Sequence, residues 1–149
     1  MPWKDGPVNG LRFPDRTVTE LMDRSAPSQT GKALDLGCAV GASSFVLANF
    51  FDRVTGLDFS ESFIEAANEI KRQGFLEYKY LEEGDTFGHG TVRCPEHSDK
   101  VSFVVGDACD LPNEWRGFDL VHAANLICRL PDPHVLFCRL PDLVKVGGQ

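Results

Sequence analysis

The sequence lacks any apolar run near the ~20 residues that a membrane-spanning helix needs, and no apolar segment follows Met1 as it would in a signal peptide. It also lacks clusters of basic residues. The net charge of -7 disfavours binding to the phosphate backbone of nucleic acids. We therefore expect a cytoplasmic protein that binds neither membranes nor nucleic acids.

The five cysteines lack the paired spacing of a metal site. Cys94 and His97 form an isolated C-x-x-H pair, whereas a structural zinc site needs a second pair of ligands. An odd number of cysteines in a chain without a signal peptide is typical of reduced thiols. We expect neither a metal ion nor disulfides.

What is present indicates one globular domain. The chain has 149 residues, of which 42% are hydrophobic and 25% are charged. Short apolar segments alternate with segments of helical periodicity, which predicts an α/β fold with a doubly wound, mostly parallel sheet of about four core strands. The predicted strands are residues 33–36, 53–57, 101–105 and 118–123, and the predicted helices are 17–24, 43–51, 62–73 and 131–143.

The helix predicted over residues 62–73 has signals at both ends. Ser60 can cap its start and Gly74 can end it. Its spacing predicts that one apolar face is buried, formed by Phe63, Ile64, Ala67 and Ile70.

A polar section, residues 75–100, separates this helix from the third predicted strand. Residues 76–83 and 91–93 can pair across a turn at residues 84–90. The sequence thus predicts a hairpin insertion before strand three.

A glycine-rich turn follows the first predicted strand. It reads Asp35-Leu36-Gly37-Cys38-Ala39-Val40-Gly41, that is, G-x-x-x-G with an acid two residues before the first glycine. Dinucleotide-binding turns have G-x-G-x-x-G instead. The acid would repel a pyrophosphate and suits the cationic amino-acid part of a ligand, although a tight turn without a ligand is the alternative.

Polar or small residues also follow the other predicted strands. Asp58 lies about 20 residues after the glycine turn, where an acid can accept hydrogen bonds from ribose hydroxyls. Asp107 and Ala108 follow the third strand, and Asn125 follows the fourth. Each could be a plain cap, but together they predict a ligand pocket at the carboxyl edge of the sheet.

Taken in this order, these segments resemble the class I, Rossmann-like S-adenosylmethionine-dependent methyltransferases over about residues 33–148. The resemblance implies S-adenosyl-L-methionine as the cofactor. It places Asp35 and the glycine turn at the methionine end, Asp58 at the ribose and Phe59 beside the adenine. The implied cofactor-binding residues are Asp35, Gly37, Cys38, Gly41, Asp58, Phe59, Asp107, Ala108 and Asn125.

Longer motifs resemble a narrower family, the methyltransferase domain of ovothiol biosynthesis. They are LDLGCAVGASSF, GLDFSESFIEAA, VGDACDLP and AANLICRLPDP. The resemblance implies methylation of an imidazole nitrogen of a mercaptohistidine-type, amino-acid-like small molecule. It also implies fusion or association with a sulfoxide synthase domain.

The superfamily sheet has seven strands, and this chain ends at the glycine pair that precedes the last three. We therefore expect an incomplete, C-terminally truncated sheet. We expect residues 1–32 to form a lead-in with a short helix, and residues 33–149 to form the cofactor-binding domain.

Asn125 and Arg129 are the candidates for positioning the acceptor, because Arg129 could pair with a substrate carboxylate. Arg16 and His122 are further candidate contacts, although a histidine inside a strand is more often a core residue. Three alternatives stay open: another small-molecule acceptor, a cofactor-binding module without activity, and an NAD-dependent oxidoreductase.

Overall fold

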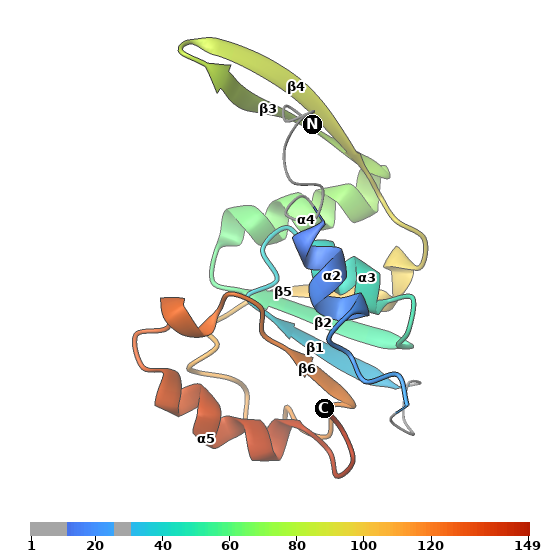
Figure 1. Cartoon of the computed structure of the whole chain (residues 1–149), viewed down its shortest axis with the longest axis vertical. Coiled ribbons are helices and arrows are strands. Elements are labelled where there is room, and N and C mark those ends of the chain that lie inside the picture. The colour runs from blue at the N-terminus through green and yellow to red at the C-terminus, as the bar shows by residue number, and fades with distance from the viewer. Residues whose placement is uncertain (1–11, 26–30) are drawn as a thin grey trace.

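The computed structural model describes residues 12–25 and 31–149 (Figure 1). Its centre is a parallel sheet with the strand order β5-β2-β1-β6. The predicted α/β fold with a four-stranded parallel sheet is confirmed. The strands are β1 (Lys32–Leu36), β2 (Arg53–Asp58), β5 (Val101–Val105) and β6 (Leu120–His122).

Strand β1 lies at the point where the strand order reverses. The chain runs outward from β1 to β2 and β5, and then returns to place β6 on the other side of β1. In register, Asp35 pairs with Gly56 on β2 and with His122 on β6. Open α/β sheets bind ligands beyond the carboxyl ends of strands at such a switch point.

Helices cover both faces of the sheet, as a doubly wound fold requires (Figure 1). One apolar cluster joins α2 and α4 to the sheet through Val18, Val54 and Ile70. The other joins α5 through Leu34 and Leu136. The helices are α2 (Phe13–Thr19), α3 (Ala42–Leu47), α4 (Glu61–Gln73) and α5 (Pro133–Leu143), and the 3-10 turns are η1 (Ser98–Lys100) and η2 (Ile127–Arg129).

Helix α4 begins and ends where the sequence predicts. The Ser60 side chain accepts a hydrogen bond from the backbone N–H of Phe63, and Gly74 ends the helix at a φ of 80°. Ile64, Ala67 and Ile70 are buried as predicted. Phe63 is not, because it is 46% exposed on the side of the helix that faces the cavity described below.

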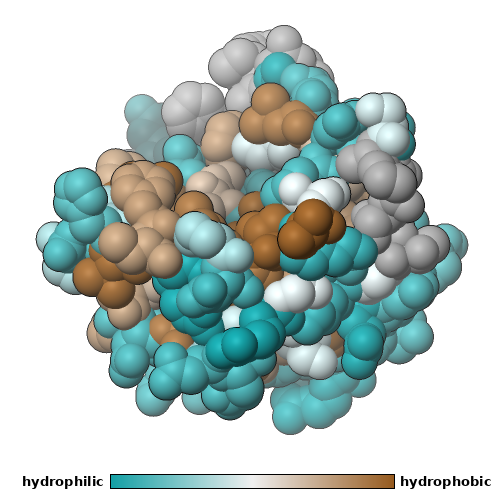
Figure 2. All heavy atoms as spheres, turned by 90° about the horizontal axis from the view of Figure 1, so that it is seen from below, coloured by the Kyte–Doolittle hydropathy of each residue, from teal (hydrophilic) through white to brown (hydrophobic). Residues whose placement is uncertain are grey.

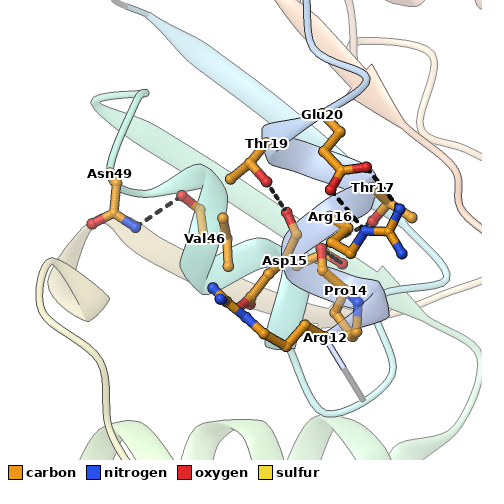
Figure 3. A network of polar contacts seen from close by, with 10 residues as sticks. Arg12, Pro14, Asp15, Arg16, Thr17, Thr19, Glu20, Val46 and Asn49 are labelled. Carbon is orange, nitrogen blue, oxygen red and sulfur yellow. Dashed lines mark hydrogen bonds and ion pairs between the residues drawn. The ribbon is translucent and has the colours of Figure 1, made fainter. Parts of the chain in front are cut away.

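Helix α2 lies earlier in the sequence than the predicted range of 17–24. Pro14 is in its first turn, where a fixed φ favours helix. Ion pairs from Arg12 to Asp15 and from Arg16 to Glu20 follow helical spacing (Figure 3). The prediction used only the spacing of apolar residues. It therefore missed the proline in the first turn and the ion pairs, and placed the helix too late in the sequence.

Most of the predicted 1–32 lead-in lies outside the described residues or within α2. The described part does not stand apart from the domain, since Val18 and Met22 are buried in the same cluster as Ala33 of β1. Strand β1 itself begins at Lys32. The domain boundary between residues 32 and 33 remains a prediction.

Helix α3 is shorter than its predicted range of 43–51. It ends at Leu47, and the Asn49 side chain donates a hydrogen bond to the backbone oxygen of Val46 in its last turn (Figure 3). An amide that bonds to the backbone in this way competes with continued helix.

The predicted hairpin is present as β3 (Phe75–Glu83) and β4 (Thr86–Arg93). Its turn is much tighter than the predicted 84–90, because β4 continues through two glycines. Tyr78 lies opposite Gly90 and Tyr80 lies opposite Gly88. A Cβ on Gly88 would lie 2.3 Å from the Tyr80 ring, so the tyrosines occupy the space above the glycines. Glycine in a strand marks such a close approach.

The C-terminal elements are shorter than predicted. Strand β6 contains only residues 120–122, and Phe118 forms an isolated bridge with Val144 instead. Helix α5 begins at Pro133 because the Asp132 side chain caps it by accepting from the His134 N–H.

Seen from below the view of Figure 1, the surface of the molecule is largely hydrophilic with separate apolar patches (Figure 2). In the described part of the chain, no helix is long and apolar enough to cross a membrane.

Candidate functional site

A cavity of about 760 Å³ lies beyond the carboxyl ends of the parallel strands. It brings together nearly all of the residues that the sequence predicts for the site. These are Asp35, Gly37, Cys38, Asp58, Phe59, Asp107, Ala108, Asn125 and Arg129. Among residues that the sequence did not predict, Phe13 and Pro14 of α2 and Phe63 of α4 also line it. A signal for the α2 residues was absent because their position depends on tertiary packing.

The glycine turn holds its shape through backbone contacts with β2. The N–H groups of Gly37 and Cys38 both donate to the Leu57 oxygen, at 2.8 and 3.0 Å. Gly37 has a φ of +72°, in the left-handed region that favours glycine. A Cβ on Gly37 would lie 3.1 Å from Leu126, so the turn passes close to the segment after β6.

Gly41 is not among the residues that line the cavity. It precedes α3 at a φ of 87°, and a Cβ there would lie 2.4 Å from the Phe103 ring. Close packing against β5 therefore requires a glycine here, and its predicted contact with the cofactor remains a prediction.

Asp35 is buried at the carboxyl end of β1, and each of its carboxylate oxygens has a side-chain hydrogen-bond partner. Ser44 donates its hydroxyl to one oxygen at 2.6 Å, and His122 Nδ1 lies 2.7 Å from the other. His122 ends β6 and also lines the cavity. The carboxylate thus ties β1 to α3 and β6 at the cavity wall.

Asp58 connects the glycine turn to the start of α4. Its two carboxylate oxygens accept hydrogen bonds from the backbone N–H groups of Ala39, at 2.8 Å, and Ser60, at 2.9 Å. Asp107 similarly accepts from the N–H of Cys109 at 2.8 Å. Each carboxylate oxygen can accept a second hydrogen bond, so these acids can still bind a ligand.

Burial raises the pKa of the Cys38 thiol well above its ordinary value, and the nearby Asp35 and Asp58 carboxylates raise it further. The thiol therefore stays protonated near neutral pH and is a poor nucleophile. Cys38 therefore contributes a neutral, buried side chain to the cavity wall rather than a reactive thiolate.

Asn125 and Arg129 are both exposed at the cavity, after β6 and in η2. Asn125 has a φ of 54°, which is uncommon for a residue other than glycine. Arg16, a further candidate, is bonded to Glu20 on α2 and does not line the cavity. Across residues 12–25 and 31–149, no cluster of side chains is suited to hold a metal ion.

A family model for a methyltransferase domain matches residues 34–149. The O-methyltransferase cnsE of Penicillium expansum is 26% identical over 136 residues, covering 91% of this chain and 42% of that protein. The 27-O-demethylrifamycin SV methyltransferase of Amycolatopsis mediterranei is 28% identical over 140 residues, covering 91% and 44%. This chain thus spans less than half the length of these relatives.

Solved structures show the same fold. The phosphoethanolamine N-methyltransferase 1 of Haemonchus contortus, in complex with phosphoethanolamine and S-adenosylhomocysteine, has a TM-score of 0.61 at 22% identity. The match covers 89% of this chain and 23% of that one. A TehB-like S-adenosylmethionine-dependent methyltransferase from Corynebacterium glutamicum has a TM-score of 0.59 at 18% identity, with 97% and 61% covered. The chain belongs to the methyltransferase domain family, in the S-adenosylmethionine-dependent class that the sequence predicted.

Proposed function

We propose that the cavity binds S-adenosylmethionine and that the chain transfers its methyl group to a small molecule. The observation that carries this proposal is the cavity itself. It lies at the switch point of the sheet and is lined by acids from the ends of three adjacent strands, Asp35, Asp58 and Asp107. The family match supports a methyltransferase over an NAD-dependent oxidoreductase.

The residues at the wall fit each part of this cofactor. Phe59 is 79% exposed beside the cavity, where its ring can pack on an adenine. Ala108 leaves room for the edge of the base, and Asp107 can accept from its exocyclic amine. Asp58 can accept hydrogen bonds from ribose hydroxyls with the lone pairs that its backbone partners leave free.

The methionine end of the cofactor would lie at the glycine turn, beside Gly37 and Cys38. Asp35 contributes negative charge near the cationic amino group, although Ser44 and His122 already hold its oxygens. When bound, the cofactor supplies an electrophilic methyl group on a sulfonium. The protein accelerates transfer mainly by holding the acceptor in line, an effect worth up to about 7–11 kcal/mol.

We further propose a mercaptohistidine-type acceptor, methylated on an imidazole nitrogen. Support comes from the resemblance of the four longer motifs and from Arg129, an exposed cation at the cavity that can pair with an amino-acid carboxylate. Asn125 offers an amide beside it. A cytoplasmic location and association with a sulfoxide synthase domain complete this proposal and rest on the same resemblance.

Calorimetry with S-adenosylhomocysteine tests cofactor binding. We expect the chain to bind it and Asp58→Ala to weaken binding at least about tenfold, because the ribose loses a charged hydrogen-bond partner. Asp85→Ala, at an exposed acid in the hairpin turn, is the matched control and should bind as the parent does. Melting curves show whether Asp58→Ala remains folded. Absence of binding by the parent chain contradicts the proposal.

Methyl transfer is tested by mass spectrometry after incubation with S-adenosylmethionine and 5-mercaptohistidine. We expect an N-methyl product, with much less product from histidine as the comparison acceptor. Cofactor binding without any methylated product would contradict methyl transfer to this acceptor and would leave the proposed cofactor site in place.

A further inference from the structure

The two ring nitrogens of His122 differ in their hydrogen bonding. Its Nδ1 lies 2.7 Å from an Asp35 oxygen, and Asp35 is itself fixed by the Ser44 hydroxyl at 2.6 Å. The other ring nitrogen, Nε2, is buried and has no hydrogen-bond partner in the described part of the chain. A buried polar atom without a partner is costly and calls for an explanation.

The Asp35 contact determines which form of the ring is present. A carboxylate only accepts hydrogen bonds, so Nδ1 must carry the proton that is donated to Asp35. In the neutral ring Nε2 then holds a lone pair and can accept a hydrogen bond or a proton. A partner that supplies an N–H or O–H group would satisfy this atom.

The ring that carries this lone pair belongs to the wall of the cavity. The imidazole is 12% exposed and lines the cavity together with Asn125 and Arg129, the two candidate acceptor contacts. The other ionisable groups at the wall are less suited to take up a proton. The carboxylates of Asp35, Asp58 and Asp107 already accept hydrogen bonds from the protein, and a carboxylate is ordinarily a weaker base than an imidazole. Arg129 is a cation and Cys38 stays a neutral thiol.

We propose that His122, oriented by Asp35, accepts the proton that the acceptor loses when it is methylated. This rests on the proposed function and adds a catalytic residue to it. In this step the lone pair of an acceptor nitrogen forms a bond to the methyl carbon while the methyl–sulfur bond breaks. The electron pair of the broken bond stays on sulfur. The proton of the acceptor N–H then moves to Nε2, which leaves a neutral N-methyl product and an imidazolium paired with Asp35. The acceptor class is therefore a small molecule that carries an N–H or O–H proton.

Turnover and binding, measured separately, test this assignment. We expect His122→Gln to lower the rate of methyl transfer by about 100-fold or more, and to change S-adenosylhomocysteine affinity by less than about twofold. Added imidazole should restore part of the rate to His122→Ala. His134→Gln is the matched control, because His134 lies on α5 outside the cavity. An unchanged rate in His122→Gln overturns the inference.

Nitrogen NMR of the histidine rings tests it without turnover. We expect His122 to carry its proton on Nδ1 and Asp35→Asn to abolish that state. Adding 5-mercaptohistidine to the chain saturated with S-adenosylhomocysteine should shift the Nε2 resonance, while His134 stays unchanged. If S-adenosylhomocysteine binds but the Nε2 resonance does not shift, only a water molecule contacts this nitrogen. The inference is then overturned and the cofactor proposal stands. If S-adenosylhomocysteine does not bind, the proposed function fails first.

Discussion

The parallel sheet and the β3–β4 hairpin are both built from paired strands, but different forces hold them together. Along β1, all residues but the first are buried, whereas no residue of β3 or β4 is fully buried. The sheet is stabilised by apolar contacts between segments far apart in the sequence. The hairpin extends away from the sheet (Figure 1) and depends mainly on pairing between neighbouring segments.

This contrast indicates where the function lies. The cavity is lined by residues from the ends of all four parallel strands and by no residue of the hairpin. A site needs side chains held in fixed positions, and closely packed elements provide that rigidity. We therefore expect changes in the sheet to affect stability and binding together, and changes in the hairpin to affect neither strongly.

The largest expected difference between the sheet and the hairpin is the loss of stability when a leucine is shortened. Leu34→Ala removes a side chain that is 0% exposed on β1, and should lower the free energy of unfolding by about 2–5 kcal/mol. Leu81→Ala makes the same chemical change on β3, where the side chain is 61% exposed, and should stay within about 0.5 kcal/mol. Urea unfolding followed by circular dichroism measures both. Similar losses in the two variants would contradict the distinction.

Glycine substitutions in the two regions should also differ in their cost to stability. Gly41→Ala forces a left-handed residue against the packed Phe103 ring, and should cost about 1–3 kcal/mol. Gly88→Ala meets the Tyr80 ring on the hairpin, which can swing away, so its effect should stay within about 1 kcal/mol. Thermal unfolding of the two variants gives the order. A more harmful Gly88→Ala would show that the hairpin is packed more rigidly than we infer.

Thiol reactivity compares the two regions under native conditions. Because its pKa is raised, folded Cys38 should react with iodoacetamide at pH 8 at least about tenfold more slowly than Cys94, which lies half-buried just beyond β4. Peptide mass mapping over time measures both rates, and urea should remove the difference. Equal rates in the folded chain would contradict it.

The raised pKa of Cys38 also makes the free energy of unfolding depend on pH. Above the ordinary thiol value of 9.0, the unfolded chain loses the Cys38 proton and the folded chain keeps it. Unfolding should therefore become easier as pH rises through this value. Cys38→Ala should flatten this part of the pH profile of the unfolding midpoint, while Cys128→Ala, at an exposed thiol, should leave it unchanged.

The smallest expected effect comes from shortening the hairpin. Replacing residues 80–88 by an Asn-Gly turn joins the cross-strand partners Lys79 and His89 directly. Affinity for S-adenosylhomocysteine should change by less than about twofold, because no hairpin residue lines the cavity. A marked loss in calorimetry would assign the hairpin a part in the site.

Local patterns were sufficient to predict much of this protein. The alternation of apolar and helical segments predicted the parallel sheet, and Ser60 and Gly74 marked the ends of α4. The spacing of acids after strands predicted which residues meet at the cavity. Such features depend on neighbours in the sequence, and parallel strands bring their carboxyl ends to one edge whatever the details of packing.

Which of these residues touch depends on how distant segments pack. Asp35 and His122 lie 87 positions apart, and the register between β1 and β6 makes them partners. The approach of Phe103 to Gly41 and the place of Phe13 at the cavity have the same origin. Local sequence patterns thus specify the α/β fold and the edge of the sheet that holds the site. Packing decided the contacts within that site, because a side chain's partners depend on how distant segments align, and no local period records that alignment.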